Sequence, residues 1–545
     1  MKIKYIFNIL YLTFIIIITA LNGCNTKQSP ENQIKSAANT QIIRLEGGDW
    51  GYPNPYAHYP RGPGGYKTNL IFDSLLESDE KGLIPWLAEK WQTIDNGKQY
   101  LFTIRQNVKF HDGSLLTPED VAFSLEYANK YPQSWSYLYK AIQSVQIHDN
   151  KNVLVTVVIP SAPMLLYLGR TRILPKHIWK DITQPKLFKS KESIIGCGPY
   201  CLTDYNKSHG IYRFEAFKDY WGPKQAVNII EYIPISQPIL AYERGDIDMA
   251  IVPPDVLDRF QKDPKNKIVK SPSFWGFRML FNMVDVPIFQ NKTIRHAIRY
   301  ALDLDAIVEK TARGAAIPGS AGMLSPDNVM FNPDVKKYEY NLKKAISLLE
   351  NSGYKYFDKN GIRKNQNGDQ LTFQLLCSSG ARISRSPISE IRIAEMIKEY
   401  LQKAGIDIKV KSADQRSRDS AVKSYNYEMV LLGHGGWGSD PQFLKKRFAD
   451  EIKQGNSLVE CCSYGYHNDL LNKLLNLQSI TFNNNKRKQL IFDIQKLFAE
   501  ELPEIPLFNT TNYTVFRPST YDGWKFMYDH HSLSHSKLSF LKKRH

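Results

Sequence analysis

The segment at residues 432–443, LGHGGWGSDPQF, contains the residue types in this chain that are best suited to contact a ligand. Gly436 and Gly438 have no side chains, so another backbone can approach them closely. Trp437 lies between them as a rigid wall, and Asp440 follows with a negative charge. Such a carboxylate can hold an ammonium group through a strong charge-assisted hydrogen bond. The pattern therefore indicates a binding site.

A second interpretation of the same carboxylate stays open. Asp440 precedes Pro441, and this pair is typical of the first turn of a helix, where the aspartate accepts backbone N–H groups. His434, near the other end of the segment, could be a metal ligand, but a lone histidine beside the end of a strand is more often structural. Local chemistry alone does not separate ligand contact from helix capping at Asp440.

The cysteines predict no metal site. Five follow Cys24, an odd number that cannot all pair within one chain. Cys197 and Cys201 flank a Gly-Pro turn and could form a disulfide in an oxidising compartment. A zinc site that adds Cys461 and Cys462 is conceivable, but adjacent cysteines rarely supply two ligands of one tetrahedron. Unpaired, partly buried thiols are the expected state.

The sequence offers no sign of an enzyme. It contains no Walker P-loop, no His-Glu-x-x-His helix and no Gly-x-Ser-x-Gly elbow. We therefore predict no catalytic residue and no cofactor.

The net charge of +17 does not predict nucleic-acid binding, because the basic residues are spread along the whole chain. There is no RNA-binding aromatic signature and no zinc-finger spacing. Two denser basic runs, at 483–489 and 540–545, look like a solvated helix surface and a frayed chain end.

The N-terminus predicts export and lipidation. Lys2 and Lys4 precede an apolar run over residues 6–20, which is shorter than the roughly 17–25 residues of a spanning helix and fits a signal peptide. The run ends in LNGC, which resembles the lipobox of bacterial lipoproteins, so residues 1–23 should be removed and Cys24 should carry lipid. Residues 24–40 have almost no large apolar side chains and should form a flexible tether. An uncleaved signal anchor is the alternative, and both place the body of the chain outside the cytoplasmic membrane.

Helices and strands alternate through the second half of the chain, which predicts an α/β domain with a mixed or parallel sheet. Residues 292–314 are amphipathic at helical period and should form one helix that ends at Gly314. Residues 427–436 read as a strand. In the first half, Thr117 and Pro118 mark a strong helix start.

Five segments carry a specific resemblance to a known family. They are WLAEKWQTIDNGKQYLFTIRQNVKFHDGSLLTPEDVAFSLEYA (86–128), IIGCGPYCLTDY with FKDYWGP (194–223), AYERGDIDMA (241–250), FNMVDVPIFQNKTIRHAIRYALDLDAIVE (281–309) and LPEIPLFNT (502–510). In this order they resemble the bacterial extracellular solute-binding proteins of family 5, which serve peptide and nickel ABC importers. The resemblance covers residues 41–517, with Cys197 where a threonine is more usual.

The resemblance implies an α/β fold of the periplasmic-binding-protein type, class II, in its large peptide-binding form. It has two lobes, an inserted subdomain and two hinge crossings. Lobe I would comprise residues 41–70, 180–281 and 504–545, with an inserted subdomain at 71–179, and lobe II would comprise residues 282–503. Crossings near Phe281 and Ile505 would form the hinge, because a few residues can absorb a large rotation.

The resemblance also assigns roles to residues. In similar peptide binders the Gly-Trp-x-x-Asp positions hold the ligand's main chain and amino terminus, and these correspond here to Gly436, Trp437, Gly438 and Asp440. Pro441 stands where a second acid often lies. The match favours ligand contact by Asp440.

Three further aromatic residues lie where family members often line the cleft. Trp50 and Tyr52 are in a Gly- and Pro-rich loop, and Trp275 precedes the first crossing. Packing is the competing interpretation for each of them.

The implied function is that of a lipid-anchored, monomeric component of an ABC importer that captures peptides and closes its lobes on them. Its partners would be permease subunits with cytoplasmic ATPases, and it would contact the membrane through the N-terminal lipid. The alternatives are a binder of nickel, a metallophore or another small solute on the same fold, and a surface receptor or chaperone-like peptide binder.

Overall fold

The computed structural model describes residues 41–58, 64–79, 82–133, 138–380, 388–434, 440–449, 463–526 and 533–542. The predicted signal peptide, Cys24 and the tether lie outside these residues, as do Gly436, Trp437, Gly438, Cys461 and Cys462. Residues 41–545 form one compact unit.

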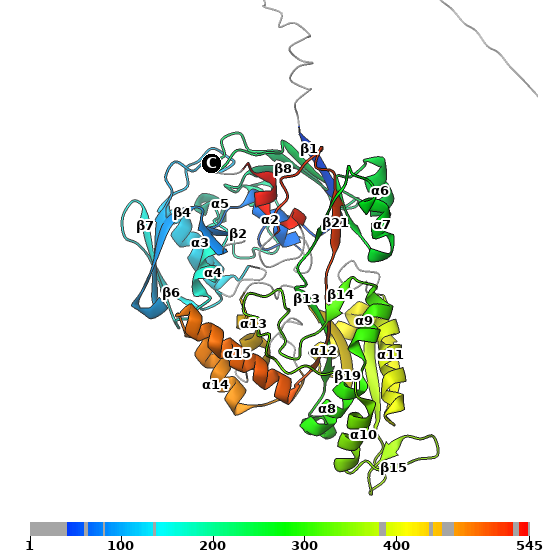
Figure 1. Ribbon diagram of the computed structural model, residues 1–545. Helices are drawn as coiled ribbons and strands as arrows, with labels where there is room; N and C mark the ends of the chain where they lie inside the picture. The colour runs from blue at the N-terminus through cyan, green and yellow to red at the C-terminus, as the bar shows by residue number, and fades with distance from the viewer. Residues whose placement is uncertain are drawn as a thin grey trace, which may run out of the picture. The chain divides into compact units, whose positions relative to one another are not determined.

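Lobe I contains two sheets, and each is built from distant parts of the chain (Figure 1). The four-stranded sheet has the order β1 (Ile42–Glu46), β10 (Ile229–Ile233), β9 (Ile211–Ala216), β8 (Tyr200–Asn206). The three-stranded sheet has the order β11 (Met249–Val252), β21 (Tyr513–Phe516), β12 (Lys267–Lys270). Its helices are α2 (Gly64–Ile71), α5 (Lys176–Trp179), α6 (Pro238–Arg244) and α7 (Leu257–Gln261). β21 joins lobe I from near the end of the chain, so the lobe is discontinuous in sequence.

A subdomain beside these sheets has its own hydrophobic core. Its antiparallel sheet has the order β4 (Ala88–Ile94), β5 (Gln99–Ile104), β7 (Asn152–Val157), β6 (Ile142–Ile147). The hairpin of β2 (Leu76–Asp79) and β3 (Gly82–Pro85), α3 (Pro118–Lys130) and α4 (Met164–Gly169) complete it. The predicted helix start is confirmed, because Thr117 and Asp120 form a reciprocal capping box and Pro118 is the first helical residue.

Lobe II contains a mixed six-stranded sheet, which confirms the predicted α/β architecture. Its order is β14 (Ala316–Pro318), β20 (Ile505–Thr510), β13 (Trp275–Phe281), β19 (Met429–His434), β17 (Thr372–Ser378), β18 (Asp407–Ala413). β17 runs parallel to β18 and β19, whereas β13 is antiparallel to β19 and β20. A small hairpin, β15 (Tyr356–Phe357) with β16 (Arg363–Lys364), lies outside this sheet.

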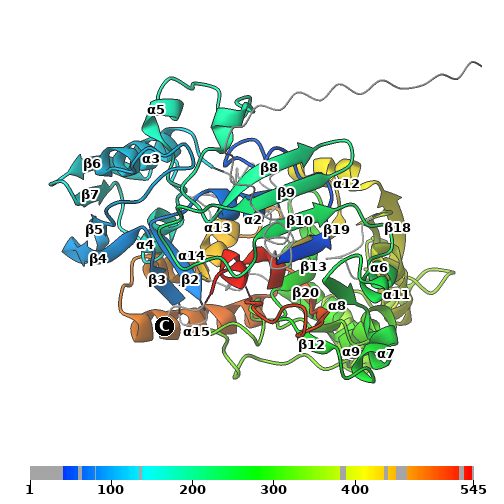
Figure 2. The same cartoon turned by 90° about the horizontal axis from the view of Figure 1, so that it is seen from above.

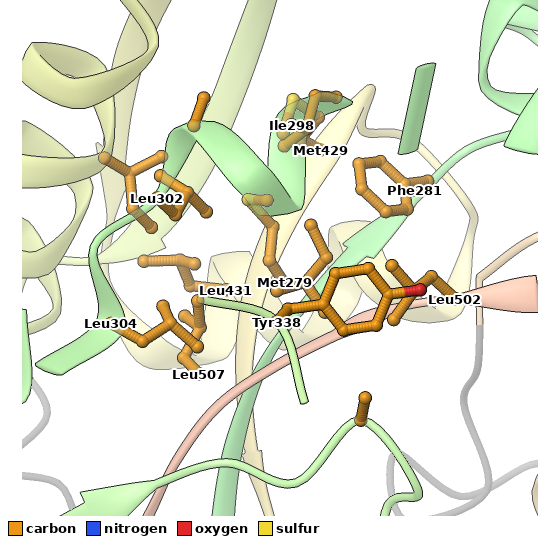
Figure 3. Packing of buried hydrophobic residues seen from close by; sticks show 14 of the residues in the cluster. Met279, Phe281, Ile298, Leu302, Leu304, Tyr338, Met429, Leu431, Leu502 and Leu507 are labelled. Carbon is orange, nitrogen blue, oxygen red and sulfur yellow. The ribbon is translucent and has the colours of Figure 1, made fainter. Parts of the chain in front are cut away.

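Helices lie on both sides of this sheet (Figures 1 and 2). They are α8 (Lys292–Ala301), α9 (Leu304–Ala312), α10 (Leu342–Asn351), α11 (Glu390–Lys403), α12 (Gln415–Lys423), α13 (Gln442–Phe448), α14 (Asp469–Ser479) and α15 (Asn484–Glu501). Figure 3 shows Met279 of β13 and Met429 and Leu431 of β19 in the core, with Ile298 of α8 and Leu507 of β20. The single helix expected over 292–314 is wrong: Asp303 accepts a hydrogen bond from the N–H of Ala306 and starts a second helix.

The chain passes between the two lobes at residues 271–274 and 511–512, where the sheet membership of the strands changes. The N–H of Ser271 donates to the carbonyl of Asn512 at 2.8 Å, and the N–H of Asn512 donates to Oγ of Ser271 at 2.8 Å. The two crossing segments are therefore tied together. The hinge residues expected near Phe281 and Ile505 lie on the lobe II side of these crossings, at the last residue of β13 and the first residue of β20.

The frayed end expected over residues 540–545 is wrong at its first two residues, which are buried in lobe I: Phe540 is 1% exposed and Leu541 is 7% exposed. Residues 543–545 lie outside the described residues. Lys537 lies in the short helix over Lys537–Phe540, and its Nζ is 2.6 Å from Oδ1 of Asp73 and 2.9 Å from Oε2 of Glu77. Asp73 also accepts hydrogen bonds from the indole N–H of Trp86 and of Trp221. This segment therefore connects the last residues of the chain to the start of the subdomain.

Three thiols are free in the described part of the chain: Cys197, Cys201 and Cys377. This confirms the expectation of unpaired, partly buried cysteines at these positions, so the possible bridge between Cys197 and Cys201 is not formed. Burial raises the pKa of Cys201 to about 12, with a smaller contribution from Glu215. No helix among the described residues combines the length and apolarity that a membrane crossing requires.

Candidate functional site

The predicted binding segment leaves the lobe II sheet at the end of β19. Gly433 and His434 are the last residues of this strand and pair with Phe277 and Gly276 of β13. Residues 435–439, which include Gly436, Trp437 and Gly438, lie outside the described residues, and Asp440 follows them just before α13. The structure thus places the two ends of the segment on a strand and on a helix.

Trp275 is brought directly against the start of this segment. A Cβ atom on Gly433 would lie 1.9 Å from Cη2 of Trp275, so the indole occupies the space that any larger residue would need. The indole also stacks on Phe277 at a centroid distance of 6.2 Å and an interplanar angle of 14°. These contacts fix an aromatic wall, partly exposed, beside the predicted site.

Asp440 engages both a helix start and a guanidinium group. Its Oδ1 accepts the backbone N–H of Gln442 at 2.8 Å, so it does serve the first turn of α13. Arg487 of α15 binds it in a bidentate pair, with Nη1 to Oδ2 at 2.6 Å and Nη2 to Oδ1 at 2.6 Å. The side chain of Asp440 is 19% exposed and that of Arg487 is 6% exposed. The guanidinium of Arg487 therefore largely compensates the negative charge of the Asp440 carboxylate.

Arg487 is a site residue that the sequence analysis missed by treating 483–489 as a solvated surface. It shares one helix face with the buried residues Ile491, Ile494 and Phe498 of α15. That spacing of three to four residues was the available signal. Nη2 of Arg487 also donates to Oε1 of Gln478 at 3.0 Å, and Nε2 of Gln478 donates to Oε1 of Gln442 at 2.8 Å.

A buried ion cluster fixes α13 to the sheet. Nη2 of Arg447, on α13, is 2.7 Å and 2.5 Å from the two carboxylate oxygens of Glu504, just before β20. Nε of Arg278, on β13, is 3.4 Å from Oε1 of the same glutamate. Because these charged side chains are at most 1% exposed, removing one partner would be costly. The cluster holds α13, and with it Asp440, in place.

Trp50 and Tyr52 belong to lobe I, whereas Trp275 and Asp440 belong to lobe II. The backbone N–H of Trp50 donates to Oη of Tyr212 at 2.9 Å. Oη of Tyr52 donates to the carbonyl of Ser190 at 3.1 Å, and its ring meets Tyr205 edge-on at 5.5 Å. Burial, with a smaller contribution from Glu192, raises the pKa of Tyr52. The side chain of Tyr52 and the backbone of Trp50 are thus held by lobe I itself.

The described residues contain no group of three or more His, Cys, Asp or Glu side chains that could hold a metal ion.

Comparison with known proteins identifies a family. The family model described as "Bacterial extracellular solute-binding proteins, family 5 Middle" matches residues 82–455. Di/tripeptide-binding protein 1 of Pseudomonas aeruginosa (strain UCBPP-PA14) is 26% identical over 501 residues, which cover 84% of this chain and 88% of that protein. Oligopeptide-binding protein AppA of Bacillus subtilis (strain 168) is 27% identical over 475 residues and covers 84% of each chain.

A similar solved structure is NikZ from Campylobacter jejuni in complex with Ni(L-His), with a TM-score of 0.74 and 24% identity. The match covers 92% of this chain and 99% of that chain. It shows the same two-lobed fold.

Proposed function

The chain belongs to the bacterial extracellular solute-binding proteins of family 5, which are not enzymes, and on this premise we propose that it captures peptides for an ABC importer. The peptide would lie between the two lobes, and lobe closure would follow because the closed state binds it better. The chain would then deliver the peptide to permease subunits driven by cytoplasmic ATPases. Cys24 would carry the lipid that keeps it at the outer face of the cytoplasmic membrane, or in the periplasm.

One observation carries the peptide assignment: both ends of the Gly-rich segment are fixed. Gly433 lies under Trp275 at one end, and Asp440 is held by Arg487 at the other. Glycine backbone between two fixed points can exchange hydrogen bonds with an extended ligand main chain, which supplies affinity without reading side chains. We propose Gly436, Trp437 and Gly438 for this role, with Trp275, Trp50 and Tyr52 as walls.

Asp440 is our candidate for the ligand's amino group. A carboxylate has about four lone-pair sites. Within the described chain, Arg487 uses one site on each oxygen and the N–H of Gln442 uses a second site on Oδ1. One site on Oδ2 therefore remains for an ammonium donor. The attraction is weakened by Arg487 but strengthened when closure excludes water.

A nickel chelate is the second candidate, because the similar Campylobacter jejuni structure holds Ni(L-His). Native mass spectrometry of the purified protein should reveal a copurifying peptide. Calorimetry with alanine peptides of two to nine residues, and separately with Ni(L-His), then measures affinity. Binding of Ni(L-His) with no peptide binding would overturn the peptide assignment and favour the second candidate.

A further inference from the structure

The inserted subdomain touches lobe II at a place away from the two crossing segments. Figures 1 and 2 show α4 of the subdomain and α14 of lobe II on the same side of β13, to its left, whereas the crossings lead directly into β13 and out of β20. Among the described residues, the hydrophobic cores of the subdomain and of lobe II have no member in common. The contact therefore joins two surfaces that are packed separately.

Gly97 of the subdomain receives an aromatic ring from lobe II. It lies in the turn between β4 and β5, and a Cβ atom on it would lie 2.2 Å from Cζ of Phe482. Residues 94–96, which precede it in the turn, are exposed, whereas Gly97 is buried. The ring of Phe482 is therefore in contact with the backbone of a turn whose other residues face water.

A backbone hydrogen bond joins the same two surfaces. The N–H of Ala162, just before α4, donates to the carbonyl of Ser479 at 2.7 Å. Ser479 is the last residue of α14, where the carbonyl groups have no partner within the helix. Lys98, which follows Gly97, accepts the N–H of Val157 through its carbonyl at 3.0 Å. The turn and the segment that leads into α4 therefore form one patch on the subdomain.

The lobe II side of this contact is connected to the candidate ligand anchor. Arg487, which binds Asp440, also donates from Nε to the carbonyl of Gln478 at 3.1 Å, one residue before Ser479. Nζ of Lys445, on α13, is 3.4 Å from Oγ of Ser479. The end of α14 is thus held by the same arginine and the same helix that hold Asp440.

We infer that these contacts form a latch, which joins when the lobes close and separates when they open. The latch consists of Gly97 and Ala162 on the subdomain and of Ser479 and Phe482 on lobe II. Rotation at the crossing segments moves distant surfaces apart without disturbing either core. The latch stabilises the closed state, and so raises ligand affinity, without touching the ligand. The inference rests on the lobe closure proposed above but not on the identity of the ligand.

Hydrogen exchange at the N–H of Ala162 measures whether the latch is joined. In wild type, saturating trialanine should slow this exchange, because the closed state becomes the populated one. The amides of β5 provide the internal reference, since they belong to the subdomain core and should not respond to lobe opening. Exchange at Ala162 that is the same with and without bound ligand would overturn the inference.

Two variants weaken the latch from opposite sides. Phe482→Ala removes the ring, and Gly97→Ala places a Cβ atom where the ring lies. Each should weaken trialanine binding about 3- to 10-fold in calorimetry, the order expected when a half-buried phenylalanine ring loses its apolar contact. Each should also speed the exchange of Ala162 in the peptide-bound protein. Since Phe482 belongs to neither core of the described chain, Phe482→Ala should leave the midpoint of thermal unfolding unchanged.

Gly113→Ala is the matched control. Its φ is +88°, against +79° at Gly97, and a Cβ atom there meets nothing of the described chain within 4 Å beyond its neighbours. It carries the same backbone strain without the collision, so its affinity should stay within about twofold of wild type. In the double variant, Phe482→Ala removes the collision, so Gly97→Ala should add less than about twofold to the loss. Equal losses in Gly113→Ala and Gly97→Ala, or additive losses in the double variant, would overturn the inference.

A second probe separates the failure of this inference from that of the proposed function. If wild type binds no alanine peptide but Ni(L-His) slows the exchange at Ala162, the peptide assignment fails and the latch stands. If wild type binds trialanine and Phe482→Ala binds it equally well, the latch fails and the proposed function stands. If neither probe slows the exchange at Ala162, the latch fails.

Discussion

The ion pair between Asp440 and Arg487 can be broken from either side, and the two breaks should differ in their effect on binding. Asp440→Asn keeps the side-chain shape and removes the negative charge. Arg487→Met removes the positive charge and leaves the carboxylate in place. If Asp440 holds the ligand's ammonium group, only the first change removes the anchor.

Both variants should lose stability. Removing one partner of a buried pair costs about 3–5 kcal/mol. Arg487 keeps its hydrogen bonds to the side chain and carbonyl of Gln478, and Asp440 is 19% exposed, so we expect a smaller loss of about 1–3 kcal/mol for each. Urea unfolding of the peptide-free variants measures this quantity.

The effect on peptide affinity separates the two roles. A hydrogen bond to a charged group contributes about 1.5–3 kcal/mol. Arg487 already offsets the carboxylate charge, so the lower half of this range applies to Asp440→Asn, about 10- to 40-fold. In Arg487→Met the N–H of Gln442 still holds Asp440, so the uncompensated carboxylate should keep or increase the affinity.

Calorimetry with trialanine and N-acetyl-trialanine provides the assay. Wild type should prefer the free amine, and Asp440→Asn should lose that preference. Equal affinity losses in Asp440→Asn and Arg487→Met would refute the reasoning, because the pair would then act only by shaping the site. Equal binding of both peptides by wild type would refute it as well.

Two other predictions concern side-chain packing, one in lobe I and one beside the candidate site. Lys537→Met leaves the carboxylates of Asp73 and Glu77 buried without their cation and should lower the free energy of unfolding by about 3–5 kcal/mol in urea titrations. Burial raises the pKa of Glu77, but the attraction to Lys537 outweighs this effect and brings the pKa below its ordinary value. Its contribution is therefore present above the ordinary pKa of a glutamate, about 4.3, and is lost only as the pH falls through the lower folded-state pKa, so the wild-type advantage over Lys537→Met should shrink as the pH falls; an advantage that grows on acidification would contradict the assignment. Gly433→Ala puts a Cβ atom into the indole of Trp275 and should displace it, seen as a shifted tryptophan fluorescence maximum and weaker peptide binding; unchanged spectra would contradict the packing.

Local signals predicted local structure well. Thr117, Pro118 and Asp120 satisfy one another within a single turn, so the start of α3 could be read from four residues. The strand before the Gly-rich segment was equally clear, because its apolar run is buried on both faces of the sheet. The position of Trp275 against Gly433 could not be predicted, since it depends on pairing between strands more than 150 residues apart.

The misses have a common physical cause. Arg487 and Phe540 belong to basic runs that look solvated, but each is buried against a partner far away in sequence. A charged side chain is rarely buried without a partner, and that partner is invisible to local patterns. Asp303 shows the converse, where one capping residue divided an amphipathic run into two helices.

The ion pair of Asp73 with Lys537 also orders the assembly of the two lobes in time. The two residues are 464 positions apart because lobe I is built from both ends of the chain. Because the chain emerges from its N-terminal end, the ammonium becomes available only after the carboxylate and the whole of lobe II. The lobe II sheet, in contrast, needs only the continuous stretch from Trp275 to Thr510. Lobe II, although it begins later, can therefore finish folding first, and the core of lobe I closes only when the last residues of the chain are available.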